Sequence, residues 1–354
     1  MTSVTTTGPR EPIRLPANQP PQFYRGGDAI AALRGASSSG TASGKKFGPE
    51  DWVGSTTTLF GQDTNGLTRL SSGEWLRDAV RAAPEAWLGA EHVAAFADST
   101  GLLVKLLDAG QRLPVHFHPS NSFAREHFDS HFGKSEAWIV IGTYGDDPRV
   151  YPGFRETVAE HTVQDWVRDQ DTDAMLGALN SVAVSPGDTV YIPSGLPHAI
   201  GEGVFVVELQ QPTDFSLTIE WRNFLDSPEK GHLGLGFDTA LRALDTSGWD
   251  EDRLGGIVKR TAGDSSSTVD LLAAGAAEFF RADQLRPSAP LALDPSFAVL
   301  VVLEGSGALR TEHGGEIALS KGDTFVVPHA AGQAELSGDT TVIRCRPPAP
   351  ERSS

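Results

Sequence analysis

Short apolar runs separated by glycine and proline turns recur along most of the chain. They cover residues 102–110, 139–145, 181–195 and 203–221, and they return from residue 269 onward. Short strands at regular spacing, with turn signals between them, are typical of a β-sandwich or a jelly-roll barrel. The pattern therefore predicts a mainly β protein.

Two segments interrupt the β pattern with helical spacing. In residues 151–180, Val163, Trp166 and Val167 belong to an apolar series with the period of a helix, which predicts a helical insertion of about thirty residues. Residues 226–266 contain two or three helix-like stretches with turn breaks, and we expect a helical connector there. Thr56, Thr57 and Thr58 favour a strand.

A weak internal repeat divides the β pattern into two modules. Residues 187–193 read GDTVYIP and residues 322–328 read GDTFVVP, a Gly-Asp turn followed by an alternating strand and a proline. We therefore expect one β domain over residues 47–225 and a second over residues 267–348. The proline-, threonine- and serine-rich residues 1–46 are expected to be mobile or to lie along the surface.

Histidine is concentrated in one stretch of the first module. Four of the ten histidines lie between Gly110 and Trp138. His116 and His118 are separated by one residue, so both imidazoles would point to the same face of a strand. Glu136 follows in the next strand-like run, and His198 lies in the run after the insertion. Three nitrogens and one carboxylate oxygen suit Zn²⁺ or another divalent first-row metal.

The second module lacks the corresponding ligand. His198 lies five residues after Pro193, and the equivalent position after Pro328 is Gln333. We therefore expect a metal in the first module only.

The net charge and the cysteine content limit the kinds of partner that the chain could bind and the compartment that it could occupy. The net charge of −17 disfavours nucleic acid and anionic membranes, since both would be repelled. Cys345 is the single cysteine, which excludes an intrachain disulfide and fits a reducing compartment. No apolar run reaches the roughly 18 residues that span a bilayer. With no apolar signal core in the first 21 residues, a cytoplasmic protein is expected.

The two histidine motifs resemble those of the cupin superfamily. Gly110, His116 and His118 fit a first motif of glycine, five residues and His-x-His, and Gly187, Pro193, Gly195 and His198 fit the second. Within the cupins, the chain resembles the class I mannose-6-phosphate isomerases in their short bacterial form. The resemblance runs from about residue 20 to residue 348, and it implies two jelly-roll barrels with a helical insertion. Its strongest parts include the runs GKSEAW and PGDTVYIPSGLPHAIGEGVFVVELQQPTD.

The resemblance implies a role for each matching residue. The family's metal ligands fall at His116, His118, Glu136 and His198, and its sugar-site residues fall at Lys105, Lys134, Glu208 and Glu50. Lys134, Glu208 and Lys105 are the candidate acid–base groups. Three positions depart from the family pattern: His116 replaces a glutamine, Arg25 replaces a tryptophan, and residues 215–218 lack an arginine. Arg222 carries the nearest guanidinium, and Arg222, Arg25 or another cation could contact the sugar in its place.

The implied function is aldose–ketose isomerisation of mannose 6-phosphate to fructose 6-phosphate, or of a related sugar, through a cis-enediol. The implied partner is a small phosphorylated sugar, and the implied cofactor is a divalent metal such as Zn²⁺. A cupin dioxygenase would use a similar ligand set. A non-catalytic sugar-binding or regulatory relative would keep the metal without turnover.

Overall fold

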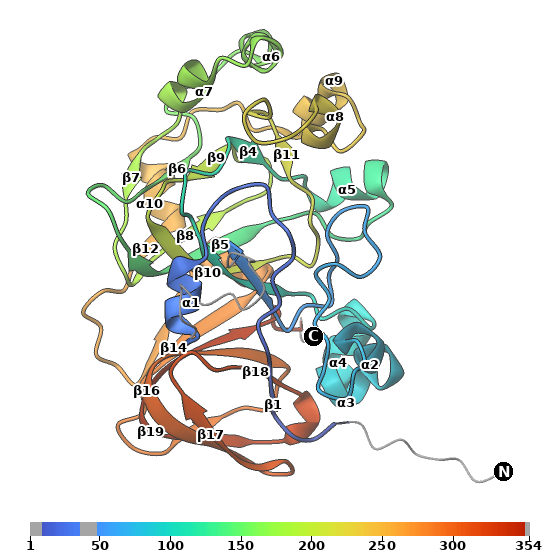
Figure 1. The fold of residues 1–354 in the computed structure, drawn as a ribbon, viewed down its shortest axis with the longest axis vertical. Coiled ribbons are helices and arrows are strands. Elements are labelled where there is room, and N and C mark those ends of the chain that lie inside the picture. Colours follow the sequence, from blue (N-terminus) through green and yellow to red (C-terminus); the bar gives the residue numbers. More distant parts are fainter. Residues whose placement is uncertain (1–8, 36–47, 351–354) are drawn as a thin grey trace, which may run out of the picture.

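The computed structural model describes residues 9–35 and 48–350. Its strands form three sheets of eight, six and five strands, which confirms the predicted mainly β class. Figure 1 shows two β regions stacked along the long axis, with the C-terminal strands in the lower region. The proposed division into two barrels, with its domain limits, stays a prediction.

The six-stranded and five-stranded sheets make up the upper region. The six-stranded sheet has the order β12-β8-β5-β10-β3-β2, and the five-stranded sheet has the order β11-β4-β9-β6-β7, with antiparallel neighbours throughout. Their bounds are β2 Glu50–Val53, β3 Leu103–Asp108, β4 His116–Phe117, β5 Glu136–Thr143, β6 Arg149–Pro152, β7 Val182–Ala183, β8 Asp188–Ile192, β9 His198–Ile200, β10 Val204–Gln210, β11 Leu217–Thr218 and β12 Val258–Arg260.

The eight-stranded sheet makes up the lower region. Its main path is β1-β18-β16-β19-β14-β13, with β15 on β19 and β17 on β16. The bounds are β1 Ile13–Arg14, β13 Thr268–Asp270, β14 Arg281–Leu285, β15 Leu291–Leu293, β16 Ala298–Thr311, β17 Gly315–Ser320, β18 Thr324–Val327 and β19 Ala334–Arg346.

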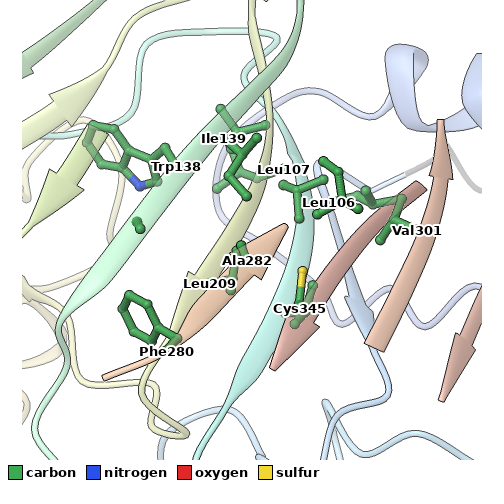
Figure 2. Close-up of a cluster of buried hydrophobic side chains, with 14 of the residues drawn as sticks. Leu106, Leu107, Trp138, Ile139, Leu209, Phe280, Ala282, Val301 and Cys345 are labelled. Atoms are coloured by element: carbon green, nitrogen blue, oxygen red, sulfur yellow. The ribbon is translucent and has the colours of Figure 1, made fainter. Parts of the chain in front are cut away.

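One hydrophobic core joins the two regions. Leu106, Leu209 and Trp138 of the six-stranded sheet belong to the same buried cluster as Val301 and Cys345 of the eight-stranded sheet. Figure 2 shows Leu106, Leu209, Val301 and Cys345 lying between strands of the two sheets, whereas the Trp138 ring points to the other side of its strand. Burial of this apolar surface stabilises the contact between the sheets, so the regions are held together by shared packing.

Helices cover the ends and edges of the sheets. Their bounds are α1 Asp28–Leu33, α2 Leu76–Ala82, α3 Pro84–Leu88, α4 Ala90–Phe96, α5 Asn121–Phe128, α6 Glu160–Asp169, α7 Thr172–Ala178, α8 Pro228–Gly231, α9 Phe237–Ala240 and α10 Glu251–Ile257, with the 3₁₀ turns η1 Leu241–Ala243, η2 Ala274–Glu278 and η3 His329–Ala331. In the predicted insertion, Val163, Val167 and Met175 bury against Phe117 and Leu217 of the five-stranded sheet.

The structure corrects the expectation that the N-terminal segment is mobile or superficial. Within residues 9–35, β1 pairs with β18. The side chains of Leu15 and Ile30 are buried, because both pack into the shared core. Residues 1–8 and 36–46, which the same expectation covered, lie outside the described part of the chain.

Two further expectations about local structure are corrected. The helical connector also contributes β12, which pairs with β8. The strand expected over residues 56–58 is replaced by irregular structure, because β2 ends at Val53 and the chain turns at Gly54, whose φ is 61°. Within the described residues, no helix has the length and apolar character to cross a membrane.

Candidate active site

The three predicted histidine ligands converge between the two upper sheets. His116 on β4 and His198 on β9 are paired across neighbouring strands, and their Nε2 atoms lie 3.1 Å apart. One nitrogen from each of His116, His118 and His198 can be chosen so that all three lie within 4.8 Å of one another. All three side chains are buried. Imidazole nitrogens in this arrangement can hold a divalent first-row metal.

Backbone carbonyls orient all three rings. Nδ1 of His116 lies 2.9 Å from the Pro114 oxygen, and Nδ1 of His198 lies 2.8 Å from the Leu196 oxygen. Nδ1 of His118 lies 2.8 Å from the Phe215 oxygen. A carbonyl only accepts, so each Nδ1 carries the proton and each Nε2 keeps its lone pair toward the centre of the cluster, as metal-binding histidines require.

Glu136 brings a carboxylate to the same point. Its Oε2 is 3.0 Å from His118 Nε2, and its Oε1 is 3.3 Å from His198 Nε2. Trp138 Nε1 donates to Oε1 over 3.0 Å, whereas the buried Oε2 has, among the described residues, an ion pair with Lys134 at 3.1 Å and no further hydrogen bond. Burial would raise the pKa of Glu136, but Lys134 and His118 together lower it well below its usual range. Desolvation lowers the pKa of His118 to about 3.

These charge states match what a metal needs. The carboxylate is ionised, burial holds the pKa of His116 far below its ordinary value, and Glu136 Oε2 has a lone pair to offer. The four groups therefore fit a divalent cation, which binds neutral imidazoles and an ionised carboxylate.

Lys105 and Glu208 face each other beside this cluster. The register aligns Trp138, Glu208, Lys105 and Trp52 in one row across β5, β10, β3 and β2. Lys105 Nζ is 3.8 Å from Glu208 Oε2 and 4.9 Å from the centre of the Trp52 ring. Burial raises the pKa of Glu208 to about 8, despite the opposing effect of Lys105. Burial alone would lower the pKa of Lys105, but Glu208 and Glu50 raise it. The row therefore holds a fixed cation next to a carboxyl group that can change protonation near neutral pH.

Lys134 connects this row to the metal cluster. Its Nζ is 3.1 Å from Glu136 Oε2, 3.2 Å from His118 Nε2 and 4.0 Å from Glu208 Oε1. The ammonium group thus lies between the two carboxylates, close to any oxygen that reaches the cluster.

Glu50 anchors the other side of Lys105. Its Oε2 is 3.4 Å from Lys105 Nζ and accepts from Trp52 Nε1 at 2.6 Å, while its Oε1 accepts from the Tyr24 hydroxyl at 2.5 Å. Burial would raise the pKa of Glu50, but Lys105 and the Tyr24 and Trp52 hydrogen bonds lower it. Tyr24 is absent from the predicted site residues. Its only sequence signal is an aromatic residue beside the Gly26-Gly27 pair.

A cavity of about 680 Å³ opens onto these groups. Most of the predicted site residues line it, namely Glu50, Lys105, His116, Lys134, Glu136 and Glu208. His118 and His198 lie directly behind the lining, in contact with Glu136 and His116. Arg222 does not line the cavity. Its side chain is exposed and donates to the backbone carbonyl oxygen of Asp169 over 3.2 Å, because the chain after β11 turns toward α6.

Outside the cavity, hydrogen bonds of Asn121 and Gln211, here called the clamp, fix the loop that carries Lys134 and leads into β5 at Glu136. Asn121 Oδ1 accepts from Gly133 N at 2.8 Å and from Gln211 Nε2 at 3.0 Å. Gln211 Oε1 in turn accepts from Ser135 N at 3.0 Å. A Cβ on Gly133 would come within 2.3 Å of the Pro119 oxygen, so only glycine allows this close approach.

Comparisons with known proteins agree on one family. The family model described as "Mannose-6-phosphate isomerase, cupin domain" matches residues 279–347, which belong to the lower β region. Mannose-6-phosphate isomerase ManA of Bacillus subtilis is 30% identical over 248 residues, 68% of this chain and 73% of that protein. Mannose-6-phosphate isomerase of Streptococcus mutans is 27% identical over 286 residues, 79% of this chain and 84% of that protein.

The fold is also that of a solved relative. The crystal structure of the mannose 6-phosphate isomerase from Bacillus subtilis superposes with a TM-score of 0.74 at 23% identity, over 95% of this chain and 99% of that one. The identity and coverage of the Bacillus subtilis ManA match, together with the cupin-type fold, show that this chain belongs to the mannose-6-phosphate isomerase family.

Proposed function

We propose that this chain is a metal-dependent aldose–ketose isomerase that interconverts mannose 6-phosphate and fructose 6-phosphate, or carries out the same reaction on a related sugar. The observation that carries the proposal is the convergence of three oriented imidazoles and Glu136 in a cavity that also contains Lys105, Lys134 and Glu208. Family membership supports the same reaction class.

In this proposal His116, His118, Glu136 and His198 hold the metal, and Zn²⁺ is the first candidate because three nitrogens and one carboxylate suit it. When bound, the metal would act as a Lewis acid that polarises the carbonyl oxygen of the open-chain sugar. Cobalt, manganese or iron would suit the same ligands, and metal analysis of the purified protein would identify the native ion.

The protein's own groups move the proton. We assign Glu208 to carry a proton between C2 of the aldose and C1 of the ketose, because its pKa of about 8 leaves both protonation states populated near neutral pH. Lys105 stays charged between Glu50 and Glu208 and stabilises negative charge on the enediol oxygens. Lys134, beside His118 and Glu136, donates to the sugar oxygen nearest the metal ligands.

The proposal is tested with a coupled assay that follows conversion of mannose 6-phosphate to fructose 6-phosphate by Zn²⁺-loaded protein. Free mannose and other aldoses are assayed in parallel. Turnover of any aldose to its ketose, lost on removal of the metal with a chelator and regained on its return, supports the proposal. Absence of turnover for every sugar at one metal ion per chain contradicts it and favours a sugar-binding relative without catalysis.

A further inference from the structure

The hydroxyl group of Tyr24 is a buried polar group of the cavity wall that takes no part in the proposed proton transfer. Tyr24 lines the cavity and is 6% exposed. Its hydroxyl donates to Glu50 Oε1 at 2.5 Å, a short distance that is typical of an ionised acceptor. Burial and the nearby Glu50 raise the pKa of Tyr24 well above its ordinary value. The hydroxyl therefore keeps its proton and remains a donor to Glu50.

Glu50 depends on this donor because its carboxylate is buried away from water, at 5% exposure. Its Oε2 accepts from Gln22 Nε2 at 2.9 Å and from Trp52 Nε1 at 2.6 Å, and it lies 3.4 Å from Lys105 Nζ. Among the described residues, Oε1 accepts from Tyr24 alone. A buried carboxylate oxygen without a donor favours the protonated form, so loss of the Tyr24 hydroxyl should make Glu50 easier to protonate.

The charged groups around Glu50 do not secure its charge by themselves. Burial, the largest effect, raises the pKa of Glu50, and Lys105 on β3 and Lys134 next to β5 lower it. The same two lysines also face Glu208 on β10 and Asp214, which follows β10. The two cations are thus shared among several carboxylates, and the neutral hydrogen-bond donors complete the stabilisation of ionised Glu50.

Strand β3 places both Tyr24 and Lys105. Lys105 lies within this strand, and Asp108 at its end accepts from Gly27 N at 2.8 Å through Oδ2. A Cβ on Gly26, whose φ is 155°, would lie 1.9 Å from the backbone oxygen of Asp108, so only glycine permits this approach. The glycine pair fastens the segment just after Tyr24 to the strand, and this contact sets the position of Tyr24 relative to Lys105.

We propose, on the basis of the isomerase function proposed for this chain, that Tyr24 is a positioning residue whose hydroxyl keeps Glu50 ionised and directed at Lys105. Lys105 Nζ lies 3.4 Å from Glu50 and 3.8 Å from Glu208. A protonated Glu50 would no longer attract the ammonium group, which would then move toward Glu208 and away from the position in which it stabilises the enediol oxygens. Tyr24 thus acts on the reaction through Glu50 and Lys105.

The variant Tyr24→Phe removes the hydroxyl and keeps the ring, and its kcat is measured against pH on Zn²⁺-loaded protein. Glu50 acts in its ionised form, so activity is lost as the pH falls through its pKa. Loss of a hydrogen bond to a charged group raises that pKa, and the acid limb of the profile should move up by about one to two pH units. Tyr151→Phe, on β6 outside the cavity lining, should leave the limb unchanged. An unmoved limb in Tyr24→Phe overturns the inference.

A double variant separates this role from a role in packing alone. In the Glu50→Gln background no charge remains at residue 50, so adding Tyr24→Phe should leave the acid limb where it is. An equal shift of the limb with and without Glu50 would show that Tyr24 acts by another route, and it would contradict the inference.

Thermal unfolding at several pH values keeps the test independent of turnover. The lowered pKa of Glu50 stabilises the folded protein above the ordinary pKa of a glutamate, and this stability is lost as the pH falls. Tyr24→Phe should therefore lower the melting temperature most near neutral pH. Its difference from the wild type should narrow as the pH falls, and this narrowing should be absent in the Glu50→Gln background. A difference that is the same at every pH overturns the inference. The expected narrowing, found in a protein that turns over no sugar, would leave the hold of Tyr24 on Glu50 intact and refute only the proposed function.

Discussion

At the scale of single residues, the three imidazole rings of the metal cluster are fixed in orientation by hydrogen bonds. Each Nδ1 is committed to a backbone carbonyl, so none of the three rings can rotate its Nε2 away from the centre without losing a buried hydrogen bond. The protein therefore holds the ligand directions in place through its backbone, and a single ring should be hard to replace.

Replacing His118 by alanine should abolish both metal binding and isomerase activity. The variant removes one of three nitrogens and leaves Glu136 without its 3.0 Å partner. Metal content per chain and turnover are measured together after loading with Zn²⁺. His161→Ala, at an exposed position on α6, is the matched control and should retain both. One metal ion per chain in the His118 variant would show that the assigned ligand set is wrong.

Replacing Glu208 by glutamine should lower kcat by roughly 10²–10⁴-fold while the metal stays bound, since the amide cannot carry the proton. The measurement is kcat with parallel metal analysis. Glu202→Gln changes an exposed glutamate in the turn before β10 and should have little effect. Activity of the Glu208 variant within a few-fold of the wild type would exclude this carboxyl group as the proton carrier.

The sequence predicted the residues of the site better than their surroundings. His116, His118 and His198 lie in motifs with fixed local spacing, and a strand places such residues on one face. Tyr24 reaches Glu50 only through the tertiary fold, which spacing cannot reveal. Arg222 follows β11 closely in sequence, but the chain turns there and carries its side chain to Asp169.

At the scale of elements, α5 acts on the site through its first residue. Ser120 caps the helix by accepting from Phe123 N, and Asn121 then holds Gly133 and Gln211. The helix is absent from the elements that the apolar pattern predicts, because it is short and Ala124 is its one buried residue. The clamp depends on a contact between residues 90 positions apart, which local spacing does not reveal. The helix therefore fixes the strand entry that carries Lys134 and Glu136.

Replacing Asn121 by alanine should lower kcat by roughly tenfold, because small displacements of catalytic groups are costly. The lost acceptor also leaves two donors without a partner, which should reduce the free energy of unfolding by about 1–3 kcal/mol. Kinetics and denaturant unfolding measure the two effects. Asn121→Asp keeps an acceptor oxygen and should restore most of kcat, whereas Ser122→Ala, an exposed neighbour, should match the wild type. Equal loss of kcat in the alanine and aspartate variants would contradict the clamp.

At the scale of the whole molecule, the shared core predicts cooperative unfolding. Phe280 precedes β14 of the lower region and packs in the same cluster as Leu209 and Trp138 of the upper region. Loss of packing in one region should therefore weaken the other, although the proposed metal ligands all lie in the upper region.

Replacing Phe280 by alanine should destabilise the protein by about 3–5 kcal/mol, and it should lower the temperature of metal release together with that of global unfolding. Calorimetry and a metal-sensitive dye record the two events. Phe23→Ala, at a position with 45% exposure, should cost below about 1 kcal/mol. Metal release at an unchanged temperature would show that the two regions unfold independently.

The pairing of β1 with β18 has a consequence for biosynthesis. Ile13 is synthesised well before its partner Val326, and Gln22 and Tyr24, a few residues after β1, form part of the cavity wall. At roughly 5–20 residues per second, the ribosome separates the two strands by about 15–60 s. β1 therefore waits for its partner strand while the upper sheets are synthesised, and the segment that carries Gln22 and Tyr24 is anchored on its β1 side only after β18 has emerged.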